Sequence, residues 1–160
     1  MEKLNTLRSI RGKYPSKEAI EEILSTIPTS EEYFLLRDAV LEWKLELFKD
    51  HYKLWRLKTH VEKMTGLYLL CDIVSHKHGK FLNMCEGNSY AFCPHNDEIM
   101  LGQNPSIIST MHELAHFLGI KSEIQAVHIS LSIFKELYPK SFEKLKFDGN
   151  THVLKKNERN

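Results

Sequence analysis

The sequence predicts an α+β fold in which a small antiparallel sheet packs against helices. In the first 65 residues, apolar side chains recur at spacings of three, four or seven, which is the periodicity of one helix face. Between residues 66 and 101, turn residues separate short apolar segments, which is typical of an antiparallel meander. We therefore expect one domain over 1–160, with a long helical region over 1–65, a sheet and further helices over 66–147, and a polar tail over 148–160.

Two helices are expected in the N-terminal region. The first covers residues 16–27, with Ser16 as its N-cap and Pro28 directly after its end. The second begins at the capping box Thr29-Ser30-Glu31-Glu32 and continues to about Met64, with Gly66 as the residue that ends it. Its predicted apolar face consists of Leu36, Val40, Trp43, Leu47, Leu54, Leu57 and Val61.

The middle of the chain has the pattern of four short strands. Clusters of Gly, Asn, Pro and His mark turns at 76–79, 86–88 and 94–96. The segments between these turns predict strands over 67–74, 80–85, 89–93 and 97–101.

The last third of the chain is predicted to be helical. One helix covers residues 105–118, with Asn104 as N-cap, Pro105 at the first helical position and Gly119 after its end. A second capping box, Ser122-Glu123-Ile124-Gln125, begins a helix to about Tyr138, and Pro139 stops it. A short helix over 140–146 and a frayed tail from Asp148 complete the chain.

Composition narrows the class of protein. The 160 residues are 42% hydrophobic and 27% charged, which is enough apolar material for a packed core. With 22 Lys and Arg against 21 Asp and Glu, the net charge of +1 gives no electrostatic case for nucleic-acid binding. The longest apolar run stops at Asp72, so we expect no membrane span. Three irregularly spaced cysteines, and an N-terminus without the apolar core of a secretory signal, favour a cytoplasmic setting.

A His-Glu-x-x-His pattern lies in the helix predicted over 105–118. His112 and His116 are four residues apart, so both imidazoles project from one helix face and can bind one metal ion. Zinc suits such ligands, and a catalytic zinc site has three protein ligands and a position left for water. Glu113 is the candidate general base, which takes a proton from that water and passes it to the leaving amine. The alternative is a helix whose two histidines are merely solvated.

Glu123 is the best candidate for the third ligand. It lies in the first turn of the next helix, and the short connection predicts that the two helices pack antiparallel, so that Glu123 returns to the level of His116. A metzincin would have a histidine or aspartate where Ser122 stands, and Ser122 is a poor ligand. The alternative role for Glu123 is an acid favoured by the helix dipole. The other candidate ligands are His128, Glu136, Asp148 and His152.

At these residues the chain resembles the zincin metallopeptidases, and more narrowly the ImmA/IrrE-like group. The similar segments are HELAHFLG at 112–119, with the apolar residues before it, and SEIQA at 122–126, which is similar to that group's Glu-x-x-Ala segment. The resemblance implies that His112, His116 and Glu123 bind zinc, that Glu113 is the catalytic acid/base, and that the substrate is a regulatory protein. It covers residues 107–126, and the group's later Phe-Ala and Met-Pro elements are absent.

The resemblance also implies how a substrate binds. In zincins the strand before the active-site helix lines the cleft, so the strand over 97–101 is expected to pair with an extended peptide through main-chain hydrogen bonds. Ile99→Pro should then abolish cleavage while zinc stays bound. The candidates for stabilising the oxyanion are Tyr90, Tyr138, His95 and His128.

The sequence thus predicts a zinc metalloendopeptidase with one catalytic Zn²⁺ and a protein or peptide substrate. The alternative function is a non-catalytic, zinc-containing regulatory or protein-binding module. A second, structural zinc site could form from Cys71, Cys85, Cys93 and His95, although their spacing lacks paired CxxC motifs and strand cysteines are more often small buried apolar residues.

Overall fold

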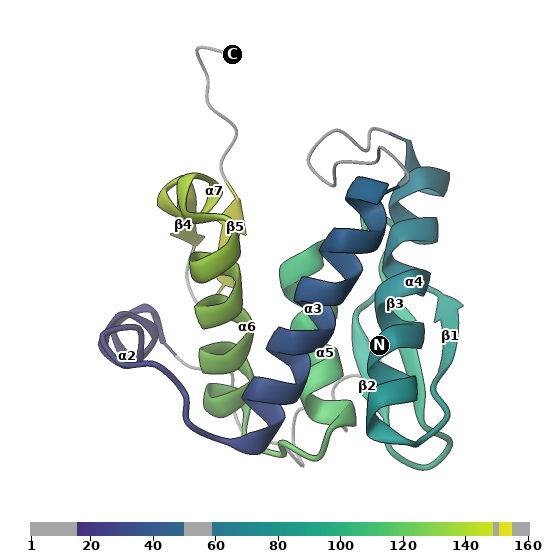
Figure 1. Cartoon of the computed structure of the whole chain (residues 1–160). Coiled ribbons are helices and arrows are strands. Elements are labelled where there is room, and N and C mark those ends of the chain that lie inside the picture. Colours follow the sequence, from purple (N-terminus) through teal and green to yellow (C-terminus); the bar gives the residue numbers. More distant parts are fainter. Residues whose placement is uncertain (1–15, 50–58, 149–150, 155–160) are drawn as a thin grey trace.

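The computed structural model describes residues 16–49, 59–148 and 151–154, and its α+β class confirms the prediction. Helices α2 (Lys17–Ile23), α3 (Glu31–Lys49) and α4 (His60–His78) precede the sheet, and α5 (Ile107–Phe117) and α6 (Glu123–Leu137) follow it (Figure 1). Within the described ranges, no helix is both long enough and apolar enough to cross a membrane.

The N-terminal region differs from the prediction after residue 49. The first helix is confirmed in a shorter form, and the Ser16 hydroxyl accepts a hydrogen bond from the amide of Ala19 at its start. The predicted second helix is interrupted, because α3 ends at Lys49 and a separate helix begins after the N-cap Thr59. Of the predicted apolar face, Leu36, Val40, Trp43 and Leu47 are buried, Val61 is exposed, and Leu54 and Leu57 lie outside the described residues.

Helix α4 replaces the strand that was predicted over 67–74. Its buried side chains follow spacings of three and four, which place them on one helix face; they are Met64, Leu67, Leu70, Cys71 and Val74. Gly66 lies inside this helix and does not end it. The buried indole nitrogen Nε1 of Trp43 on α3 donates to the carbonyl oxygen of Gly66 at 2.7 Å, so Gly66 lies at the contact between the two helices.

The sheet is mixed, whereas a fully antiparallel meander was predicted. Its strands β1 (Asn83–Glu86), β2 (Ala91–Cys93) and β3 (Glu98–Leu101) lie in the order β1-β3-β2. β2 runs antiparallel to β3, as a short turn between them requires, but β1 runs parallel to β3. Turn residues show where strands end and not which strands pair, so the sequence pattern could not reveal this arrangement.

The middle position of β3 overturns the prediction that residues 97–101 form an edge strand for substrate. Both sides of β3 already pair, with β1 on one side and β2 on the other, so no peptide can add to it. The Ile99 side chain is fully buried, and Ile99→Pro would therefore disrupt the core and would not report on substrate binding. The edge strand that contacts α5 is β2, whose three residues are all buried.

The helices after the sheet agree with the prediction except at their ends. α5 begins two residues later than expected, because the hydroxyl of Ser106 and not the side chain of Asn104 caps it. Ser122 caps α6 as predicted. The short helix predicted over 140–146 is present as α7 (Pro139–Glu143). It is followed by a hairpin of β4 (Leu145–Asp148) and β5 (Thr151–Leu154), where the end of that helix and a frayed tail were expected.

Helix α5 lies at the centre of the fold. It contacts α3, α4, α6, β2 and β3, so helices and sheet surround it (Figure 1). Nine of its eleven residues are buried, including the fully buried side chains of Met111 and Leu114. The helix that carries the His-Glu-x-x-His pattern is therefore held by packing on several sides, which fixes the positions of its polar side chains.

Candidate metal centre

The turn after α5 brings α6 back along it. Gly119 has a φ of 113°, in the region that favours glycine. Its amide donates to the carbonyl of His116 at 3.0 Å, and the amide of Ile120 donates to the carbonyl of Ala115 at 3.1 Å. These two bonds form a Schellman motif, which ends the helix and reverses the chain. α6 then starts at Glu123, and its packing against α5 confirms the prediction that Glu123 returns to the level of His116.

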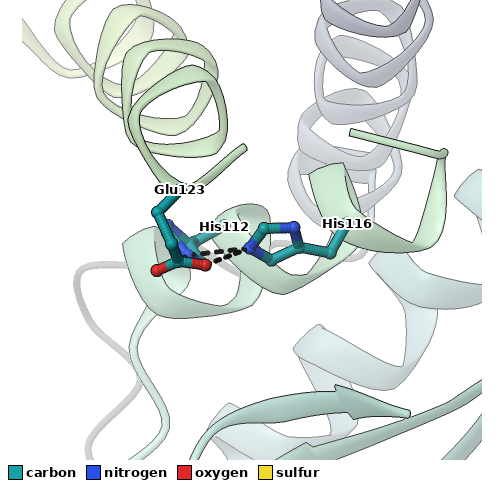
Figure 2. Close-up of side chains that lie close together, drawn as sticks. All are labelled: His112, His116 and Glu123. Atoms are coloured by element: carbon teal, nitrogen blue, oxygen red, sulfur yellow. Dashed lines mark hydrogen bonds and ion pairs between the residues drawn. The ribbon is translucent and has the colours of Figure 1, made fainter. Parts of the chain in front are cut away.

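Three polar side chains from α5 and α6 converge at this turn, as Figure 2 shows. The Nε2 atoms of His112 and His116 are 3.2 Å apart. Glu123 Oε1 lies 2.7 Å from His116 Nε2, and Glu123 Oε2 lies 3.4 Å from His112 Nε2. The exposed fractions of the three side chains are 10% for His112, 2% for His116 and 4% for Glu123. The three residues predicted as metal ligands therefore form one buried cluster.

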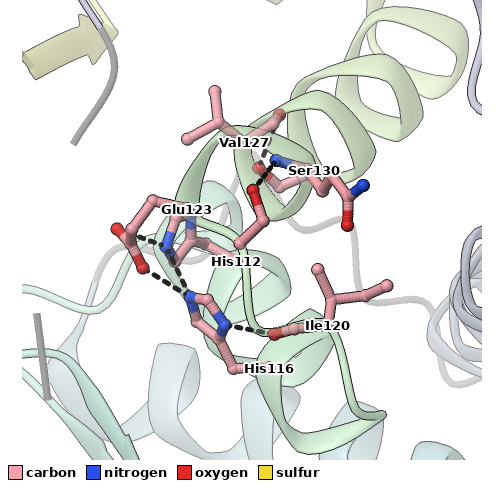
Figure 3. Close-up of polar contacts among 8 residues, drawn as sticks. His112, His116, Ile120, Glu123, Val127 and Ser130 are labelled. Carbon is pink, nitrogen blue, oxygen red and sulfur yellow. Dashed lines mark hydrogen bonds and ion pairs between the residues drawn. The ribbon is translucent and has the colours of Figure 1, made fainter. Parts of the chain in front are cut away.

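The hydrogen-bond partner of His116 determines which nitrogen is available for a metal. His116 Nδ1 lies 2.6 Å from the carbonyl oxygen of Ile120 (Figure 3). A carbonyl oxygen can only accept, so Nδ1 carries a hydrogen, and Nε2 is the nitrogen left to bind a metal. Nε2 faces Glu123 and His112. Metal-binding histidines commonly donate their second ring N–H to a carbonyl in this way.

The electrostatics of Glu123 favour its ionised form. Burial by itself would raise the pKa of the Glu123 carboxyl. Hydrogen bonds and charge interactions with His112 and His116 outweigh the burial and hold that pKa well below its ordinary value. The site thus presents a carboxylate oxygen and two imidazole nitrogens to the same point.

This donor set fits a zinc ion. Zinc binds imidazole nitrogen and carboxylate oxygen at roughly 2.0–2.2 Å, so tetrahedral geometry places neighbouring ligand atoms roughly 3.3–3.6 Å apart. Two of the three separations, 3.2 Å and 3.4 Å, are close to that range, and the 2.7 Å separation is that of a hydrogen bond. Within the described part of the chain, no other group of three or more His, Cys, Asp or Glu side chains has this arrangement.

Glu113, the predicted general base, lies in the same buried stretch of α5, directly after His112. Its side chain is 6% exposed and is not one of the three converging groups. Glu113 is therefore a carboxylate next in sequence to one ligand and separate from the ligands themselves, as the predicted role requires.

The alternative ligands are not brought to the cluster. His128 Nε2 instead donates to the carbonyl of Thr26 at 2.8 Å, and Glu136 is not part of the group. The side chains of Asp148 and His152 lie outside the described part of the structure.

The other three candidates for oxyanion stabilisation are Tyr90, Tyr138 and His95, and none of them belongs to the cluster. The hydroxyl of Tyr90 donates to the carbonyl of Asn104, in the loop before α5. The hydroxyl of Tyr138 is buried at the far end of α6, and burial raises its pKa to about 12. His95 is exposed in the turn between β2 and β3.

The cysteines do not form the second zinc site. None of the three forms a disulfide bond, and they lie on three different elements: Cys71 on α4, Cys85 on β1 and Cys93 on β2. β3 separates β1 from β2, and burial raises the pKa of the Cys71 thiol. The described cysteines therefore act as small, mostly buried side chains.

A cavity of about 440 Å³ lies elsewhere on the molecule. It is lined by His60, Glu86, Gly87, Asn88 and Gln103, none of which belongs to the cluster. We therefore place the candidate chemistry at the buried cluster and not at this open cavity.

One group at the site, the backbone carbonyl of Ile120, is not predicted by the sequence. Gly119 after the histidines was a signal for a helix end, and a left-handed glycine at that position is typical of a Schellman motif. The carbonyl that such a turn directs at His116 has no signature of its own in the residue types.

Comparisons of this chain with protein-family models, curated proteins and solved structures found no match.

Proposed function

We propose that this chain is a zinc-dependent metallopeptidase that hydrolyses peptide bonds in a regulatory protein substrate. The observation that carries the proposal is the convergence of His112, His116 and Glu123 in a buried group on the helix that also bears Glu113. This is the His/His/Glu donor set and the neighbouring carboxylate expected from the resemblance to the zincins and to the ImmA/IrrE-like group.

The roles of the residues follow from their chemistry. His112, His116 and Glu123 hold the ion, which when bound polarises the scissile carbonyl and makes water more acidic. The Glu113 carboxylate accepts a proton from the attacking water, whose oxygen bonds to the carbonyl carbon. When the C–N bond breaks, Glu113 delivers that proton to the departing amine.

The setting we propose is the cytoplasm, where the thiols of all three cysteines would stay reduced. The formal charge of +1 gives no reason to propose nucleic acid as a partner. Selective cleavage fits a cytoplasmic protease better than general digestion does, because such an enzyme must spare the proteins around it.

The proposal is tested by separating metal binding from hydrolysis. Glu113→Gln keeps the shape of the side chain and removes its basic carboxylate. We expect the zinc-loaded variant to keep one zinc per chain and to cleave a library of internally quenched peptides about 10²–10⁴-fold more slowly. The matched control is Glu46→Gln on the exposed side of α3, which should cleave as the unmodified chain does. Equal cleavage by Glu113→Gln and the unmodified chain would contradict the proposal.

The second candidate function is a non-catalytic, zinc-containing protein-binding module. The observation that favours it is the burial of the cluster, whose side chains are at most 10% exposed. On this alternative the zinc-loaded chain cleaves none of the library peptides, and Glu113→Gln leaves every measured property unchanged.

A further inference from the structure

Among the described residues, two glycines lie in the left-handed region of backbone conformation, and each lies at the C-terminal end of a helix. Gly79 ends α4 with a φ of 75°, and Gly119 follows the C-cap of α5 with a φ of 113°. Apart from the glycine itself and the chain next to it, no atom lies within 4 Å of the Cβ that either position would carry. A side chain at either glycine would therefore meet the same kind of backbone strain and no steric clash.

Only the turn at Gly119 is connected to the metal cluster. The residue after Gly119 is Ile120, whose carbonyl oxygen lies 2.6 Å from His116 Nδ1. The Schellman bonds fix that carbonyl, because the amide of Ile120 donates to Ala115 and the amide of Gly119 donates to His116. His116 is thus oriented by the turn that its own helix makes four residues later.

The hydrogen bond from His116 Nδ1 to the Ile120 carbonyl determines which of the two ring nitrogens faces the cluster. The ring can expose either nitrogen to the cluster, and its Nε2 faces Glu123 Oε1 at 2.7 Å and His112 Nε2 at 3.2 Å. A hydrogen bond from Nδ1 to a fixed carbonyl excludes the tautomer in which Nε2 carries the hydrogen of the neutral ring. Without that bond, the ring could rotate about its side-chain torsions, and either ring nitrogen could carry the hydrogen.

We propose that the backbone carbonyl of Ile120, held in place by Gly119, is the positioning group that makes His116 an Nε2 metal ligand. The inference rests on the metal centre of the proposed function and does not depend on peptide hydrolysis. The conformation of residue 119 then controls the affinity for the ion, although Gly119 itself touches neither the ion nor a substrate.

The experiment compares Gly119→Ala with Gly79→Ala in the full-length, metal-free chain. Zinc affinity is measured by competition with a chromogenic chelator, and thermal unfolding is measured in parallel without metal. We expect both variants to lose thermal stability, and Gly119→Ala to lose more, because its φ of 113° lies farther than the 75° of Gly79 from the left-handed region that alanine can adopt. Gly119→Ala should bind zinc about 10–100-fold more weakly, the usual loss when a group that orients a metal ligand is disturbed, while Gly79→Ala binds as the unmodified chain does.

A second measurement reports on the ring directly. In the zinc-saturated unmodified chain and in Gly79→Ala, nitrogen-15 NMR should show a His116 Nδ1–H proton that exchanges slowly with solvent. In zinc-saturated Gly119→Ala that proton should exchange rapidly. If Gly119→Ala does not fold, the spectrum of the unmodified chain still decides, because a His116 ring without a protected Nδ1–H overturns the inference.

The outcomes separate this inference from the function it rests on. If the unmodified chain binds no zinc, the metal centre itself is wrong. Two results would refute the positioning role of Ile120 while leaving the metal centre intact. In the first, Gly119→Ala binds zinc as tightly as the unmodified chain does. In the second, Gly79→Ala weakens zinc binding by the same factor as Gly119→Ala.

Discussion

Two histidine–glutamate pairs in this molecule have nearly the same contact distance and very different surroundings. His60 Nε2 lies 2.5 Å from Glu86 Oε1 beside the open cavity, and His116 Nε2 lies 2.7 Å from Glu123 Oε1 between α5 and α6. The side chains of the first pair are 43% and 58% exposed, and those of the second are 2% and 4% exposed. The second pair has a third donor, His112 Nε2, which lies within 3.4 Å of both partners.

The comparison shows that a short histidine–glutamate contact does not by itself indicate a metal site. Water can solvate the exposed pair and satisfy its remaining donors and acceptors, and such pairs contribute little to stability. At the buried cluster, three electron-pair donors converge where little water reaches. A bound cation satisfies them together, which is the physical basis for assigning the metal to this pair and not to the other.

Removal of a ligand from the buried cluster should have the largest effect. Zinc at about 100 times its dissociation constant should raise the free energy of unfolding of the unmodified chain by about 2.7 kcal/mol, because the ion binds only the folded state. Glu123→Ala and His116→Ala should each abolish this increase. The measurement is urea unfolding with and without zinc.

The corresponding variants of the exposed pair are the controls. His60→Ala and Glu86→Ala should keep the full zinc-dependent increase in stability. If the zinc-dependent increase in stability is lost in these two variants and kept in His116→Ala, the metal binds at the exposed pair and not at the buried cluster.

Stability without metal should differ by a smaller amount. Glu123→Ala removes the partner of two buried imidazoles and should cost about 1–3 kcal/mol in the free energy of unfolding. Glu86→Ala removes an exposed partner and should cost at most about 1 kcal/mol. Chelator-treated protein unfolded in urea provides both values, and equal costs would mean that burial does not distinguish the pairs.

The response of the exposed pair to salt should be the smallest effect. A double-mutant cycle on His60 and Glu86, at about pH 5.5 where an ordinary histidine is protonated, should give a coupling of about 0.2–1 kcal/mol at low salt. In 1 M NaCl, where the screening length is about 3 Å, that coupling should fall toward zero. The coupling of His116 to Glu123 in the metal-free chain should persist, since solvent ions do not reach a buried pair. A salt-insensitive coupling for His60 and Glu86 would contradict the contrast.

The candidate site was more predictable from the sequence than the fold around it. The positions of His112, His116 and Glu123 depend on local rules, namely the spacing of four along a helix and the reversal of the chain after Gly119. The sheet depends on contacts between distant segments. Nothing in the residues of β1 specifies that it pairs in parallel with β3, so the predicted meander was wrong.

The error at α4 has a different cause. Residues 67–74 are rich in apolar side chains, and a short apolar run does not distinguish a strand from a buried helix. The sequence predicts that Gly66 ends a helix, yet its carbonyl accepts the indole N–H of Trp43 inside the core. The tertiary contact between α3 and α4 thus accommodates a residue that local propensity places at a helix boundary.

The central claim is tested most directly by a zinc titration of the purified, metal-free full-length chain, monitored by chelator competition. We predict one zinc ion per chain for the unmodified protein and for His60→Ala, and no specific binding for His116→Ala. A chain that takes up no zinc, or a His116→Ala variant that binds it as tightly as the unmodified protein does, would contradict the account.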